Sequence, residues 1–539
     1  MPAHDIANLP SKFCPAMTDL PGQKKFGRFA WLAAILITAA IVGLHGYFFF
    51  HTGGFCGDEV NVINLAGSHS LVMMTRDSFP VLMPLLISGW TALGLANSDL
   101  HLRLLGILIG LGITSALWVA AWTTRRAPPL LSLVLLGLNG TAIYWGVYLR
   151  AYGLGSVLIL LTLSAMCFLL GRPSWWRTGI LSIVAVLSVQ ALYQNAVFFA
   201  SIGLGGWLVC RLRKDKATAW KILAAGLIAA SSLLPYWACV SKWTHSTAAI
   251  RPGFSLMAAA DNFRTLAAFP LPQYVWVWSL LGVAVVGLGI VARLRPHRPA
   301  VRSDGRMTPV ELQVFAGTTL LAALVGYLIF LYFAALITSP WYFLPLLALG
   351  AVCFDLSIPL ATLPRSFRAA AWGILIATAG IAIPFATRDL NCRFTNVDLV
   401  VKRLMQEISP QDYVVVTPWY LGISFNRYYR GAAAWDTLPP VADHSTYRFD
   451  LVKAETENSQ ASQPVLDRIA ETLQSGHRVW IVGSMRVPAP GKMAATEAGR
   501  FITAHSQSFE LIDLKTKGLI NDYEDESLLR ASGWKTNEP

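Results

Sequence analysis

Charged residues are scarce in this 539-residue sequence. They make up 14% of the chain, whereas hydrophobic residues make up 55%. A water-soluble globule of this composition would lack enough polar side chains to cover its surface. Cysteine is scarce as well: the seven cysteines are scattered without CxxC spacing, so they offer no zinc or redox motif. The composition therefore indicates a membrane protein.

Apolar stretches long enough to cross a bilayer recur along the chain. A spanning helix needs about 20 mostly apolar residues. We count about eleven such stretches, near 29–50, 103–122, 128–149, 153–170, 178–192, 195–210, 219–239, 274–292, 310–335, 341–360 and 369–387. The first resembles a signal peptide, but its apolar run is too long and no small-x-small cleavage site follows it. We expect it to stay as an anchor.

The formal net charge of +13 raises the question of a nucleic-acid partner, but the positive charge does not form one patch. It falls in short clusters between alternate spans, at Lys24–Arg28, Arg125–Arg126, Arg172–Arg177, Arg211–Lys221, Arg293–Arg306 and Arg365–Arg368. If residues 1–28 are cytoplasmic, every cluster lies inside, as the positive-inside bias requires. The pattern predicts no nucleic acid, and instead a multi-pass protein of the inner (plasma) membrane with an extracytoplasmic C-terminus.

Three segments on the predicted outer side are long enough to carry chemistry. Loops 51–102 and 240–273 belong to the predicted transmembrane domain 29–387, and residues 388–539 form the predicted extracytoplasmic domain. The first loop contains an amphipathic stretch from Phe79 to Leu95, which Pro80 opens and Pro84 breaks. We expect this stretch to lie along the membrane surface. Because Cys56 and Cys392 both fall on this side, the sequence leaves a disulfide between them open.

The sequence predicts an α/β fold for the C-terminal domain. We expect a helix capped by Asn396, a strand at Tyr413–Val416, a second helix between Pro464 and Gly476, and strands at Val479–Val482 and Phe509–Leu514. Helices that alternate with strands predict a small open sheet. The domain has no GxGxxG or P-loop motif, so no nucleotide cofactor is expected. The aromatic segment 417–431 could stack on sugar rings, although packing is the commoner role for such residues.

The acidic pair Asp58-Glu59 lies just past the first span. Most carboxylates near helix ends are simply solvated. Three features favour a functional pair: Gly57 allows a tight turn before it, a helical segment follows, and the pair opens the first outer loop. A carboxylate such as Asp58 can take a proton from an acceptor hydroxyl as general base. The sequence does not decide whether Glu59 takes part in chemistry or only tunes Asp58.

Basic residues at the outer interface are candidates for stabilising a phosphate leaving group. They are Arg150, Lys242, Arg251 and Arg264. Arg150 is the most informative because it stands alone in a short outer turn, against the positive-inside bias, although an interfacial arginine can simply snorkel. Arg103 at the start of the second span raises the same two alternatives. His245 is too isolated to indicate a metal site, and no metal is expected.

Several motifs, taken in order, resemble the GT-C-fold membrane glycosyltransferases, in particular protein O-mannosyltransferases and bacterial lipid A aminoarabinose transferases. The resemblance covers roughly residues 25 to 390 and rests on Gly57-Asp58-Glu59, the Pro-led stretch Pro80–Leu95, Leu102–Gly106, Arg150-Ala151-Tyr152-Gly153-Leu154 and Pro340-Trp341-Tyr342-Phe343-Leu344-Pro345. One departure is Tyr193-Gln194-Asn195, where many relatives carry a His-aromatic pair. Donor or acceptor choice is open at that position.

The resemblance implies a mostly α, polytopic GT-C-like bundle. It also implies a polyprenyl-phosphate sugar donor, a lipid, glycan or protein acceptor, and inverting transfer on the outer face with Asp58 as base. No cofactor is implied, and Tyr152 and Tyr342 become further site candidates. The alternative is a transporter or flippase of a lipid-linked glycan, which should concentrate ionisable or helix-breaking residues near mid-membrane. Here such charges gather at the outer interface instead.

Overall fold

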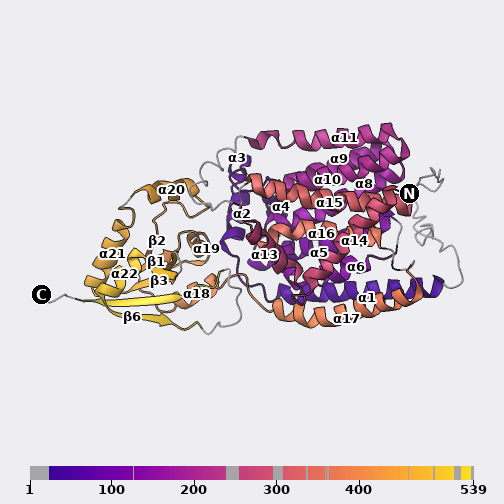
Figure 1. The fold of residues 1–539 in the computed structure, drawn as a ribbon. Helices are drawn as coiled ribbons and strands as arrows, with labels where there is room; N and C mark the ends of the chain where they lie inside the picture. The colour runs from indigo at the N-terminus through magenta and orange to yellow at the C-terminus, as the bar shows by residue number, and fades with distance from the viewer. Residues whose placement is uncertain are drawn as a thin grey trace, which may run out of the picture.

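The computed structural model describes residues 23–124, 127–237, 254–294, 307–334, 338–358, 360, 363–458, 460–489, 492–514 and 524–535. Long helices pack side by side in one bundle, and an α/β domain lies at one end of it (Figure 1). We call this end of the bundle the domain end. The chain is thus a polytopic helical bundle with a small C-terminal α/β domain, as the sequence predicts.

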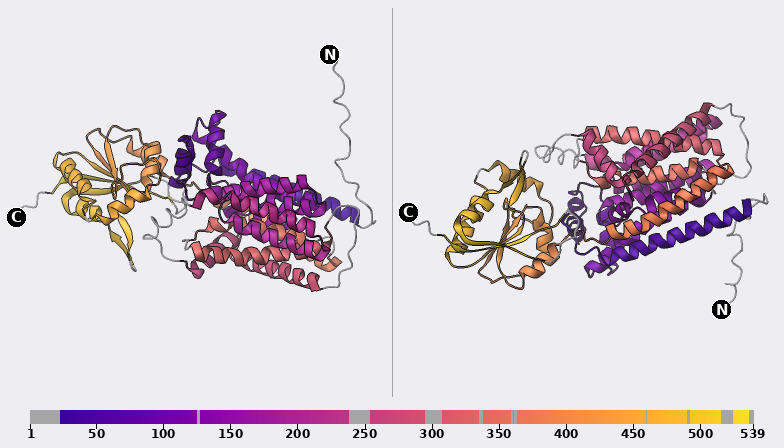
Figure 2. Two further views of the ribbon diagram at one scale, coloured as in Figure 1. Left: turned by 90° about the horizontal axis from the view of Figure 1, so that it is seen from above. Right: turned by 60° about the horizontal axis from the view of Figure 1, so that its bottom comes forward.

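Nine helices among the described residues are long and apolar enough to cross a membrane. The long helices are α1 (Gln23–Phe49), α5 (Asp99–Thr124), α8 (Ala151–Gly171), α10 (Asn195–Arg213), α11 (Lys216–Ser231, continued by η2, Leu234–Tyr236), α14 (Tyr274–Leu294), α15 (Pro309–Ala334), α16 (Leu344–Ser357, preceded by η4, Pro340–Phe343) and α17 (Arg365–Asp389). The span expected at 178–192 is the shorter helix α9 (Trp175–Ala191). Figure 2 shows these helices running along a common direction.

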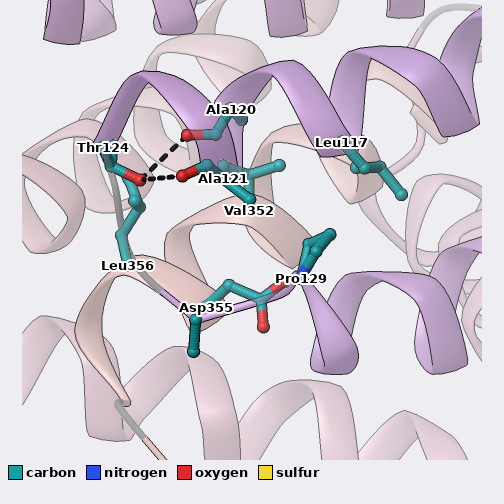
Figure 3. Close-up of a pocket in the computed structure, with 9 residues that line it drawn as sticks. Leu117, Ala120, Ala121, Thr124, Pro129, Val352, Asp355 and Leu356 are labelled. Atoms are coloured by element: carbon teal, nitrogen blue, oxygen red, sulfur yellow. Dashed lines mark hydrogen bonds between the residues drawn. The ribbon is translucent and has the colours of Figure 1, made fainter. Parts of the chain in front are cut away.

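The span expected at 128–149 is broken into three pieces. They are α6 (Leu130–Ser132), the π-helical η1 (Leu133–Gly137) and α7 (Gly140–Gly146). Asp355 explains where the first piece starts, because its carboxylate accepts the backbone N–H groups of Leu131 and Ser132, both at 3.0 Å. Figure 3 shows Asp355 in a pocket with Thr124, at the end of α5 opposite the α/β domain. This pocket belongs to helix packing far from the acidic pair.

Short helices close the domain end of the bundle. They are α2 (Gly57–Gly67), α3 (Leu71–Met74), α4 (Leu82–Ala92) and α13 (Leu256–Ala267). The amphipathic stretch expected from Phe79 to Leu95 is α4, but Pro84 does not break it. Pro84 lies in the first turn, where a backbone N–H has no partner within the helix, so proline is tolerated there.

The α/β domain contains a five-stranded sheet in the order β2-β1-β3-β7-β6. Its strands are β1 (Tyr413–Thr417), β2 (Ala434–Thr437), β3 (Val479–Gly483), β6 (Ser506–Ile512) and β7 (Leu528–Trp534), with β4 (Arg486–Ala489) and β5 (Lys492–Ala495) as a separate hairpin. β1 pairs in parallel with β2 and β3, and β7 is antiparallel to β3 and β6. The helices are α18 (Val397–Leu404), α19 (Leu421–Tyr428), α20 (Phe449–Glu457), α21 (Gln463–Gln474) and α22 (Glu497–His505).

The α/β domain docks on the bundle through α19 (Figure 1). Arg427 pairs with Asp99 at 2.5 Å, and the Tyr428 hydroxyl donates to the same carboxylate at 3.0 Å. Cys56 and Cys392 are free thiols, so the disulfide left open by the sequence is absent. No disulfide between these two cysteines therefore adds to the polar contacts between the bundle and the α/β domain.

Candidate active site

Asp58 lies in the first turn of α2, at the junction of the bundle and the α/β domain. Its side chain is 19% exposed, whereas that of its neighbour Glu59 is fully buried. A helix N-terminus favours negative charge close to it, which suits a carboxylate at this position. Only Asp58 of the pair is therefore placed to meet a ligand.

Glu59 is held in a buried ion pair with Arg103. The Arg103 guanidinium donates to the two Glu59 oxygens at 2.5 and 2.9 Å, and to the Gly54 carbonyl at 2.7 Å. The Leu149 backbone N–H donates to Glu59 Oε1 at 3.0 Å. The Arg103 side chain therefore does not snorkel to the membrane surface. It is buried, and its ion pair with Glu59 connects α5 to α2.

Arg150 lies between two carboxylates. Its guanidinium is 3.9 Å from Asp58 Oδ2 and 3.5 Å from Asp77 Oδ1, and it also donates to the Asp58 carbonyl at 3.3 Å. Burial alone would lower the pKa of Arg150, but the two carboxylates raise it well above its ordinary value. Burial raises the pKa of Asp77, and Arg150 opposes that shift. A permanent cation therefore lies beside Asp58, buried rather than snorkelling.

An aromatic wall adjoins this charged cluster. The Tyr152 ring, two residues past Arg150, lies 5.4 Å from the Tyr342 ring and 5.2 Å from the Phe79 ring between centroids. The Tyr342 carbonyl accepts hydrogen bonds from Gln194 at 3.0 Å and from the Tyr327 hydroxyl at 2.7 Å. Gln194, in the segment Tyr193–Asn195, thus attaches to η4, whose Tyr342 ring lies against Tyr152.

Of the remaining predicted residues, the described Arg264 does not join the cluster. Arg264 lies exposed in the last turn of α13, which packs on η4 through Phe263 and Phe343. Lys242, His245 and Arg251 fall outside the described residues. No group of His, Cys, Asp or Glu that could hold a metal is found within the described part of the chain.

The sequence did not indicate Asp77 or Glu524 as residues near the acidic pair. Asp77 lies in the segment 51–102 but outside its motifs, and nothing in the sequence links it to Arg150. Glu524 comes from the α/β domain, 467 residues from Gly57, yet its Oε1 accepts the Gly57 backbone N–H at 2.9 Å. Its side chain is buried, and no sequence signal could reveal that contact.

Stability should fall as pH rises from about 5 to 8. Burial raises the pKa of Glu524 from 4.5 to about 8, and that of Glu526 to about 7. Between the ordinary and raised values the folded state holds more protons than the unfolded state, so rising pH favours unfolding. We expect the apparent Tm to drop by a few degrees across this window, and less steeply in Glu524→Gln. Thermal melts at several pH values would measure this. The same decrease of Tm with pH in wild type and in Glu524→Gln would contradict the prediction.

Comparison by sequence yields no match: no family model and no curated protein matches the chain. Solved structures do show similarity. ArnT from Cupriavidus metallidurans bound to undecaprenyl phosphate is 14% identical, with 93% of this chain and 98% of that chain covered and a TM-score of 0.49. The Archaeoglobus fulgidus oligosaccharyltransferase in complex with Zn and sulfate is 11% identical, with 86% and 73% covered and a TM-score of 0.43. These likenesses concern the arrangement of the chain and assign no reaction.

Proposed function

We propose that this chain is a GT-C-type membrane glycosyltransferase that moves a sugar from a polyprenyl-phosphate donor to an acceptor hydroxyl on the outer face of the membrane. The observation that carries the proposal is the partly exposed Asp58 carboxylate held 3.9 Å from the buried Arg150 guanidinium, at the domain end of the bundle. A base and a permanent cation side by side suit a reaction that removes a proton and builds negative charge on a leaving group.

In the proposed reaction Asp58 takes the proton of the acceptor hydroxyl. The acceptor oxygen forms a bond to the anomeric carbon of the sugar while the bond from that carbon to the phosphate oxygen breaks. The electron pair leaves with the phosphate, which remains on its lipid as polyprenyl phosphate, and a single displacement inverts the anomeric centre. Arg150 keeps a positive charge 3.9 Å from the Asp58 carboxylate, on the side where the leaving phosphate gains negative charge in the proposed reaction.

The leaving phosphate needs more positive charge than the cluster supplies. Asp58 and Asp77 share one guanidinium, so Arg150 is already largely balanced. Arg264, together with Lys242 and Arg251, would provide the added charge, and Tyr152 and Tyr342 would line the approach of the sugar. In the orientation proposed here these groups lie outside and the basic loops inside, as the positive-inside bias requires.

The ArnT structure contains undecaprenyl phosphate, which is a polyprenyl phosphate like the lipid of the proposed donor. The proposal rests on the Asp58–Arg150 geometry and not on that similarity. The test is to reconstitute the purified protein in lipid vesicles with a panel of polyprenyl-phosphate sugars and hydroxyl acceptors. We expect free polyprenyl phosphate to be released with at least one donor. Movement of intact donor across the bilayer without any release would instead identify the transporter.

Arg150→Ala should weaken donor use more than acceptor use. Loss of a charge-assisted hydrogen bond costs about 1.5–3 kcal/mol, so we expect the KM for donor to rise about 10- to 100-fold. The KM for acceptor should change far less, and steady-state kinetics with each substrate varied in turn would measure both. Arg388→Ala, which removes an exposed arginine at the end of α17, is the matched control and should behave as wild type. An unchanged donor KM in Arg150→Ala would remove Arg150 from the donor site.

A further inference from the structure

Gly57 is enclosed by side chains of the α/β domain. A Cβ at Gly57 would lie 2.8 Å from Tyr447 Oη, 3.3 Å from Ser424 Oγ and 3.4 Å from Glu524 Oε1. All three neighbours come from the C-terminal domain, and Glu524 Oε1 accepts the Gly57 backbone N–H at 2.9 Å. A side chain at residue 57 would have to displace the Tyr447 hydroxyl, so glycine permits this close approach, and the turn that precedes Asp58 is built partly by a distant domain.

The α/β domain also binds the chain on both sides of this turn. Before it, the Phe55 backbone N–H donates to the Tyr428 hydroxyl at 2.7 Å. After it, Asn61 Oδ1 accepts the Tyr447 backbone N–H at 2.9 Å. Figure 1 shows α2 between the bundle and α19, in agreement with these contacts. The segment that carries Asp58 is thus anchored to the α/β domain at three successive points.

Glu524 itself is fixed within its domain. The Ser424 hydroxyl donates to its Oε1 at 3.4 Å, and its backbone carbonyl accepts the Asn396 N–H at 3.3 Å. The Asn396 side chain then bonds Asp525 and Glu526, so α18 holds the whole 524–526 segment. Because these contacts restrict the Glu524 side chain, its carboxyl group can fix the position of the Gly57 N–H group from which it accepts a hydrogen bond.

We propose that the α/β domain completes the active site, and that Glu524 is a positioning residue: by accepting the Gly57 N–H it fixes the turn that aims Asp58 at the acceptor. This inference rests on the proposed function. It gives the C-terminal domain a role in catalysis through backbone geometry rather than through substrate contact. A misplacement of about 1 Å at a catalytic group can cost about 100-fold in rate.

The test compares two substitutions at Glu524. Glu524→Ala removes the acceptor, whereas Glu524→Gln keeps an acceptor oxygen and mimics the protonated acid that burial favours. We expect kcat to fall about 10- to 100-fold in Glu524→Ala with the KM for donor within about twofold of wild type. Glu524→Gln should retain kcat within about threefold. Glu471→Ala, an exposed carboxylate on α21, is the control and should match wild type.

Hydrogen–deuterium exchange of a peptide spanning residues 55–60, measured without donor or acceptor, gives a readout that does not need activity. We expect faster exchange in Glu524→Ala and wild-type exchange in Glu524→Gln. Unchanged exchange in Glu524→Ala would overturn the inference, as would faster exchange with an unchanged kcat. If exchange rises but the wild-type protein transfers no sugar from any donor, the proposed function is wrong, and the positioning role falls with it although the contact stands.

Gly57→Ala covers the case in which Glu524→Ala does not fold. The added methyl group would press on Tyr447 and separate the turn from the α/β domain while Glu524 remains in place. We expect the same loss of kcat and the same rise in exchange, with the size-exclusion profile of wild type. A Gly57→Ala protein with wild-type kcat would contradict the inference independently.

Discussion

Asp58→Asn should abolish sugar transfer while the protein stays folded. Asparagine has nearly the same shape as aspartate but cannot accept the proton of the acceptor hydroxyl, and general-base catalysis is typically worth about 10²- to 10⁴-fold in rate. We expect a loss of that size in kcat, measured as polyprenyl phosphate released at saturating donor. Because the Asp58 side chain is partly exposed, the substitution leaves no buried cavity.

The control for this result is Asp261→Asn. Asp261 is an exposed carboxylate on α13, at the same end of the bundle, and takes no part in the cluster. Its substitution should leave kcat unchanged, and both variants should elute and melt as wild type does. Normal transfer by a folded Asp58→Asn protein would refute the assignment of Asp58 as base.

Glu59→Gln should produce the largest loss of stability. Glu59 is fully buried and Arg103 is 3% exposed, so removing the carboxylate leaves a buried guanidinium without its counter-charge. Breaking one partner of a buried pair typically costs about 3–5 kcal/mol. We expect the apparent Tm in detergent to fall by roughly 3–5 °C, because the shift per kcal/mol shrinks as the chain lengthens. The melt should be followed by the fraction of protein that remains monodisperse after heating.

Glu510→Gln provides the matched comparison, since it is the same substitution in an exposed pair. Glu510 pairs with Arg530 on the sheet surface, with side chains 48% and 26% exposed, and exposed pairs contribute about 0–1 kcal/mol. Its Tm should therefore stay close to that of wild type. Equal and small shifts for the two variants would contradict a structural role for the buried pair.

Periodic apolar patterns predicted most of the fold. In the α/β domain, the helix predicted after Asn396, the strand predicted at Tyr413–Val416 and the helix predicted between Pro464 and Gly476 correspond to α18, β1 and α21. The start of α6 was not predictable, because the Asp355 carboxylate that accepts its first backbone N–H groups comes from a helix more than 200 residues away. Asn396 does precede α18, but its side chain bonds Glu526 instead of capping the helix.

Residues of the candidate site could be predicted only where a chemically suitable side chain stands in a recognisable short motif. Asp58, Glu59 and Arg150 stand in short motifs, and the structure brings them together. Asp77 contacts Arg150, and Glu524 contacts the Gly57 backbone next to Asp58, through tertiary contacts that no local pattern encodes. The sequence also could not distinguish the two acids, because only their environments differ: Glu59 is buried against Arg103, and Asp58 meets solvent.

The most direct test of the account is the balance of products in a single-turnover reaction. A purified, reconstituted protein would be mixed with a limiting radiolabelled polyprenyl-phosphate sugar and excess acceptor. The account predicts one polyprenyl phosphate released for each sugar transferred, with inverted anomeric configuration in wild type and neither product in Asp58→Asn. Loss of donor from the outer leaflet with its sugar still attached, at equal rates in both proteins, would contradict it.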